Sequence, residues 1–147
     1  MAHVRKQIRD SVVTAVTGLT TTGANVYRTR VYPLASGKLP GLAVYTSTES
    51  SINETVTIPR TKSRTLELVV EGYVSGTANL DNTLDTIAVE VEEALVADVT
   101  RGGLAKDTQL ISTETELIGE GEKVAGVIRL TFEIIYSTLE NDVETAV

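Results

Sequence analysis

The stretch Leu66-Glu67-Leu68-Val69-Val70-Glu71-Gly72-Tyr73-Val74, with the residues that follow it, decides the fold. Its apolar residues alternate with Glu67 and Glu71, which predicts a strand with one core face and one half-polar face. Gly72 indicates a bulge. Beyond the turn at 75–77, apolar side chains recur every three or four residues, the period of a helix: Leu80, Leu84, Ile87, Val91 and Leu95. The chain therefore passes directly from a strand to a helix.

The residues before this stretch predict a first helix and a first strand. Residues 3–18 carry apolar side chains three and four positions apart, as an amphipathic helix does. Between 26 and 32, β-branched and aromatic residues alternate with Arg28 and Arg30, which places both arginines on one strand face. Pro33 ends that strand because proline donates no backbone hydrogen bond.

Further strands are predicted on both sides of the central stretch. Residues 42–45 form a short one, and the polar residues 47–63 after it are expected to be an extended loop or a hairpin arm. Residues 108–118 and 124–137 predict a hairpin. From about residue 139 the acidic tail is expected to fray.

The second helix also carries end signals. Asn79 is placed as its N-cap, and Gly102 and Gly103 follow it as a C-terminal stop. The predicted order is α-β-β-β-α-β-β, without the alternation typical of parallel sheets. Residues 1–147 are thus predicted to form a single α+β domain, in which two helices pack on a mainly antiparallel sheet of about five strands.

Composition excludes several classes of function. The net charge is −7, the wrong sign for a protein that grips a nucleic-acid backbone. There is no cysteine to form a disulfide or a thiolate site, and aromatic residues make up 4% of the chain. No apolar run approaches the length of a membrane span, and the N-terminus does not resemble a secretory signal. The sequence therefore predicts a protein of the cytoplasm that binds no membrane.

Catalytic, metal and cofactor sites are not expected. His3 is the single histidine, at a position that usually frays. The acidic pairs Asp81/Asp85 and Glu92/Glu93 fall on the solvated side of the second helix, which favours surface charge over acid–base chemistry. Residues 119–123 look like a phosphate loop but join two strands with no helix behind them. The chain is predicted not to be an enzyme.

Charged residues remain as candidates for protein–protein contact. They come from the arginine strand, the polar arm and the central strand, where opposite charges favour register and choice of partner. The candidate interface residues are Arg28, Arg30, Glu49, Glu54, Arg60, Lys62, Arg64, Glu67 and Glu71. The alternative is that they are ordinary surface charges.

Four strings, together with the order of elements, resemble the tail terminator (tail completion) proteins of long-tailed phages, a group typified by minor tail protein U of lambda-like phages. They are RKQIRDSVVTAV at 5–16, VYRTRVYPL at 26–34, LPGLAVYT at 39–46 and RLTFEIIY at 129–136. The resemblance covers nearly the whole chain. It rests on no catalytic signature.

This resemblance implies a purely structural role in a virion. The chain would form a homo-oligomeric ring, commonly a hexamer, at the head-proximal end of the tail, after synthesis in the host cytoplasm. The ring would stop polymerisation of the tail tube protein and offer its other face to the head–tail connector protein. Genomic DNA would pass through as cargo, repelled by six copies of −7 each, or −42 in all. Another virion ring, the connector or the tube protein itself, is the alternative.

Overall fold

The computed structural model describes residues 2–28, 40–76, 79–120 and 123–147. Its elements are α1 (Val4–Val16), β1 (Val26–Tyr27), β2 (Gly41–Asn53), β3 (Thr61–Gly76), α2 (Leu80–Val96), β4 (Asp107–Glu120), β5 (Lys123–Leu139) and β6 (Asp142–Ala146). The predicted α+β class and the order α-β-β-β-α-β-β are confirmed. A sixth strand, β6, follows the predicted five.

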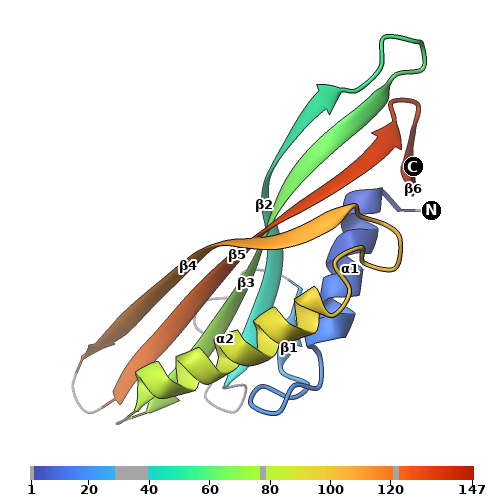
Figure 1. Ribbon diagram of the computed structural model, residues 1–147. Helices are drawn as coiled ribbons and strands as arrows, with labels where there is room; N and C mark the ends of the chain where they lie inside the picture. The colour runs from blue at the N-terminus through green and yellow to red at the C-terminus, as the bar shows by residue number, and fades with distance from the viewer. Residues whose placement is uncertain (1, 29–39, 77–78, 121–122) are drawn as a thin grey trace.

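The six strands form one mixed sheet in the order β1-β2-β3-β5-β4, with β6 added to β5. Only the contact of β1 with β2 is parallel among the described pairs. Both helices lie on one face of the twisted sheet, and the β2–β3 and β4–β5 hairpins extend past them in opposite directions (Figure 1). The molecule therefore has a helix-covered face, a face without helices and two projecting hairpins.

The main core lies between the helices and the sheet. On β5 the side chains of one face are all buried: Ile128, Leu130, Phe132, Ile134 and Tyr136. They face buried aliphatic side chains at helical spacing on both helices: Val4, Ile8, Val12 and Val16 on α1, and Leu84, Ile87, Val91 and Leu95 on α2. Periodicity alone located this core because each element presents a single apolar face.

The sequence indicated a bulge at Gly72, and this prediction is wrong. The pairing of β3 runs through it without a register shift, opposite Leu42 on one side and Ile128 on the other. A Cβ added at Gly72 would lie 2.9 Å from Ile87 Cγ2 and 3.0 Å from Ile128 Cγ2. Glycine is needed there because α2 approaches the sheet closely.

Of the two alternatives expected for 47–63, an extended loop or a hairpin arm, the structure shows the hairpin arm. Residues 47–53 continue β2 and residues 61–63 begin β3, so the two strands form a hairpin that is joined at 54–60. Serine and threonine hide such strands, because the alternation of apolar and polar residues disappears where neither face is buried.

Two other boundaries differ from the prediction. The tail is not frayed from 139, because β6 pairs with β5 and the Val147 amide donates to the Ser137 carbonyl at 3.0 Å. Within the described part of the predicted strand 26–32, β1 spans Val26–Tyr27 and Arg28 lies in a bend. Arg30 lies outside the described residues.

The helix ends are capped differently from the prediction. His3 is ordered as the N-cap of α1, where its Nδ1 accepts a hydrogen bond from the Arg5 amide at 3.0 Å. Asn79 does precede α2, but its φ is 60° and its side chain makes no capping hydrogen bond. Gly102 and Gly103 lie beyond the end of the helix. The buried Arg101 side chain instead donates to the carbonyl oxygens of Leu95, at 2.5 Å, and Asp98.

Candidate assembly surfaces

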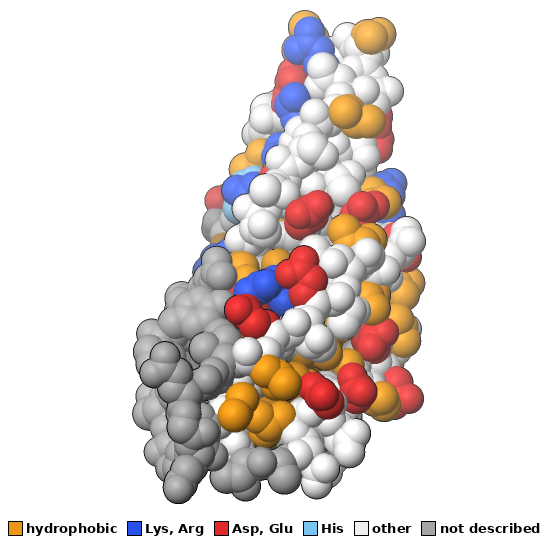
Figure 2. Space-filling view, turned by 90° about the vertical axis from the view of Figure 1, so that its left-hand side faces the viewer, with side chains coloured by type: hydrophobic (Ala, Val, Ile, Leu, Met, Phe, Trp, Pro, Cys, Tyr) orange, Lys and Arg blue, Asp and Glu red, His pale blue; other side chains and the backbone are white. Residues whose placement is uncertain are grey.

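The β2–β3 hairpin projects beyond the helices and is called the arm below, defined as residues 47–66. Three aliphatic side chains near its tip are strongly exposed: Ile52 by 67%, Val56 by 92% and Ile58 by 73%. Figure 2 shows hydrophobic and basic side chains together at this end of the molecule. Exposed apolar side chains that gather at one place are typical of a contact surface.

The arm is fastened along one side by the end of β5 and the turn into β6. The Ser137 hydroxyl donates to Glu54 at 3.1 Å, and Arg60 forms an ion pair with Glu140 at 3.5 Å. The Glu140 amide also donates to the Arg60 carbonyl at 2.8 Å. These bonds give the arm a defined direction relative to the sheet.

At the base of the arm, Glu49 joins three elements. One carboxylate oxygen is 2.5 Å from Arg5 Nη1 on α1 and 3.4 Å from Arg64 Nη1 on β3, and the other accepts from the Tyr136 hydroxyl on β5. Burial and Glu49 together raise the pKa of Tyr136, so its hydroxyl stays a donor. The Glu49 and Arg64 side chains are exposed by 10% and 12%. These two side chains therefore hold α1 and the strands together and are not available to a partner protein.

A bulge directs Glu49 to this cluster. Thr46 pairs with Leu68, but Glu49 pairs with Leu66, so three steps on β2 match two on β3. Strict alternation would put Thr48 opposite Leu66 and Glu49 on the face without helices. The extra residue places Glu49 on the helix-covered face, near the start of α1.

Glu71 lies on the face without helices and is fully buried. Its carboxylate accepts from the hydroxyls of Tyr45 and Tyr73 and lies 3.3 Å from Arg129 Nε. A small buried cluster of Ala43, Tyr73 and Val127 adjoins it. Burial of a carboxylate is tolerated where hydrogen bonds and an opposite charge satisfy it.

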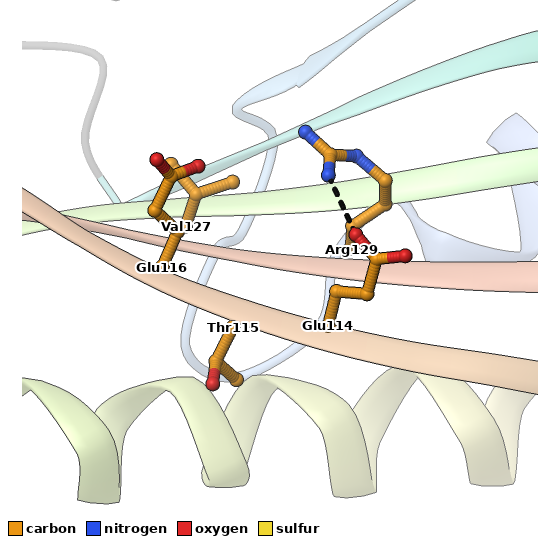
Figure 3. A pocket seen from close by; sticks show the side chains of 5 residues that line it. All are labelled: Glu114, Thr115, Glu116, Val127 and Arg129. Carbon is orange, nitrogen blue, oxygen red and sulfur yellow. Dashed lines mark hydrogen bonds and ion pairs between the residues drawn. The ribbon is translucent and has the colours of Figure 1, made fainter.

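A row of alternating charge runs from Glu71 to the edge of the sheet. Glu71 is opposite Arg129 in the pairing of β3 with β5, and Arg129 is opposite Glu114 in the pairing of β5 with β4. Arg129 Nη1 is 3.1 Å from a carboxylate oxygen of Glu114, and the Glu114 side chain is 63% exposed. Glu114, Glu116, Val127 and Arg129 point away from α2 and line a shallow hollow of about 160 Å³, whereas Thr115 points towards that helix (Figure 3).

The structure separates the nine candidate interface residues. Glu54, Arg60, Lys62 and Glu67 lie on the arm or beside it and remain at least partly exposed; Glu67 accepts from the Thr48 hydroxyl at 3.2 Å. Glu49, Arg64 and Glu71 are enclosed by the contacts above, so placing Glu71 on an exposed face was wrong. Arg28 forms an ion pair with Asp10 on α1 and is exposed. The exposed tip residues Ile52, Val56 and Ile58 were missed, although aliphatic residues in a polar stretch are a usable signal.

The described residues offer little for a metal site or a membrane span. Among the described residues, no three histidine or acidic side chains gather as metal ligands, and no helix has the length and apolar character to span a membrane. Partial burial and the nearby Arg5 and Arg64 lower the pKa of His3. The sequence predicted a frayed position for His3, but its ring nitrogen caps α1.

No protein family and no curated protein matches the sequence. Solved structures do match, among them a chain of the "Virion of native gene transfer agent (GTA) particle". It has 20% sequence identity and a TM-score of 0.49, with 90% of this chain and 90% of that chain covered. A likeness at that identity and TM-score says nothing about what this chain does.

Proposed function

We propose that this chain is a structural virion protein, the tail terminator of a long-tailed phage-like particle. It forms a ring, with six copies as the expected number, at the head-proximal end of the tail tube. There it stops polymerisation of the tube protein and provides the interface for the head–tail connector protein. The proposal rests on the resemblance of four strings across the sequence and on the geometry of the arm.

The arm is the observation that carries the contact with the tube protein. Its exposed aliphatic side chains at 52, 56 and 58 belong to the same end of the hairpin as Lys62, which pairs with Asn53, and Arg60, which directly precedes β3. Fully burying one such aliphatic side chain contributes about 1.5–3 kcal/mol. The bonds from the end of β5 and the turn into β6 hold the arm in place and so lower the conformational entropy that binding must overcome.

A terminator also needs two unlike faces, since a ring that bound tube protein on both sides would let the tube continue. The projecting arm lies at one end of the molecule and the β4–β5 hairpin at the other (Figure 1). Such polarity suits a ring whose two sides meet different partners. The excess of negative charge suits a pore through which DNA passes without adhering.

The test compares tails assembled with the wild-type chain and with a variant that carries Ile52→Thr, Val56→Ser and Ile58→Ser. Negative-stain microscopy measures tail length and ring occupancy at the head-proximal end. We expect overlong or uncapped tails from this variant, while the purified protein keeps its fold. Val89→Thr with Val96→Thr, two exposed valines on α2, is the matched control and leaves tails normal.

Two outcomes would contradict the proposal. Tails of normal length from the arm variant would remove the arm from the contact with the tube. Long tubes formed by the purified wild-type chain alone would identify it as a tube protein instead.

A further inference from the structure

The β4 strand has an unpaired edge in the described part of the sheet. It is the last strand in the order β1-β2-β3-β5-β4 and pairs there with β5 alone. From Ser112 onwards the pairing continues without a register shift up to Glu120, so the opposite edge is a regular row of backbone donors and acceptors. An edge of this length is a template for a strand from another chain.

The regular stretch of this edge lacks three features that commonly prevent pairing. β4 contains no proline and no lysine, and its one bulge lies between Leu110 and Ser112, before the regular stretch. Its charged residues are all acidic: Asp107, Glu114, Glu116 and Glu120. Pairing of β4 with β4 of a second copy would set acids against acids, which is unfavourable.

The pattern of charges within the sheet indicates which side chains on an added strand would be favourable opposite β4. Across the sheet, acidic Glu71 is followed by basic Arg129 and then by acidic Glu114 at directly opposed positions. The next position in this row lies on the strand that would be added. Glu116 is also exposed and points to the same side of the sheet as Glu114 (Figure 3). A basic residue opposite either glutamate would continue the alternation.

We propose that residues 112–120 of β4 bind an extended strand of a different protein, with basic side chains on the sheet face away from the helices. The backbone edge supplies affinity, and Glu114 and Glu116 select the partner by repelling acidic strands. This inference does not depend on the terminator role. It would hold for any assembly in which the chain takes part.

The test uses the full chain and an eight-residue probe peptide in which lysine alternates with valine, followed by amide chemical shifts in nuclear magnetic resonance. We expect saturable shifts along 112–117. Glu116→Lys should weaken binding of the lysine peptide at least about fivefold, because a cross-strand pair of opposite charge becomes one of like charge. The matched control, Glu93→Lys on the exposed side of α2, changes the net charge equally, from −7 to −5, and should leave the affinity within about twofold.

A charge swap separates recognition from misfolding. A peptide with glutamate in place of lysine should bind the Glu116→Lys chain more tightly than it binds the wild-type chain. Equal weakening by Glu116→Lys and Glu93→Lys would reveal general charge attraction and overturn the proposal, as would the absence of shifts along β4. Self-association of the wild-type chain that Glu116→Lys abolishes would assign the edge to a second copy and overturn the choice of a different protein.

Discussion

Replacing Glu49 by alanine should be among the most destabilising single changes at a polar position of the described chain. The substitution removes a single carboxylate that contacts three residues, Arg5, Arg64 and Tyr136. Tyr136 is fully buried, so its hydroxyl would lose its acceptor, which costs about 1–3 kcal/mol. Arg64 would keep its bond to the Thr138 hydroxyl at 3.2 Å but lose its carboxylate partner.

The total loss is smaller than two full ion pairs and a buried hydrogen bond would imply. Arg5 is 38% exposed, so solvent screens its pair with Glu49 and its share is below about 1 kcal/mol. We expect Glu49→Ala to lower the free energy of unfolding by about 3 kcal/mol. For a chain of this length that corresponds to a fall in Tm of about 6–12 °C.

Urea denaturation, monitored by circular dichroism, measures this loss. The double-mutant cycle of Glu49→Ala with Tyr136→Phe should show a coupling of at least about 1 kcal/mol, because phenylalanine leaves no hydroxyl to satisfy. Arg5→Ala is the comparison with a smaller expected loss. A loss below about 1 kcal/mol for Glu49→Ala, with no coupling to Tyr136→Phe, would refute the reasoning.

Three further predictions concern packing, capping and pH. Gly72→Ala should lower the free energy of unfolding by about 1–3 kcal/mol, because its Cβ would meet Ile87 at 2.9 Å; Gly76→Ala, whose nearest contact is 3.4 Å, should cost clearly less in the same urea titration. Arg101→Ala should cost about 2 kcal/mol by removing bonds to two carbonyls, and Arg101→Gly less because φ is 52°; the reverse order of stability would contradict this explanation. Because the pKa of His3 is lowered in the folded chain, the unfolded chain binds the proton first, and stability is lost as pH falls from about 6.5 through the folded pKa. His3→Asn keeps a capping acceptor without this titration, so its stability should depend less on pH between 5 and 7; an unchanged slope would exclude His3 as the cause.

Much of the architecture could be predicted because it depends on local periodicity. The alternation on β3 and β5 and the three- and four-residue steps on α1 and α2 each place apolar side chains on one face. A face of that kind has to be buried, so the order of elements and the main core followed from the sequence. The length of the strands in the arm did not, because strands with two solvated faces have no such pattern.

Sequence by itself determined the element order, the aliphatic core and the acidic, cysteine-free character of the chain. Only the tertiary structure decided which charged residues are available to a partner. Glu49, Glu67 and Glu71 look alike in the sequence, yet their environments differ. A one-residue bulge directs Glu49 to Arg5. Glu71 is surrounded by two tyrosines and Arg129, whereas Glu67 stays partly exposed. The physical reason is that the environment of a side chain depends on strand register and on residues distant in the sequence, neither of which a local pattern contains.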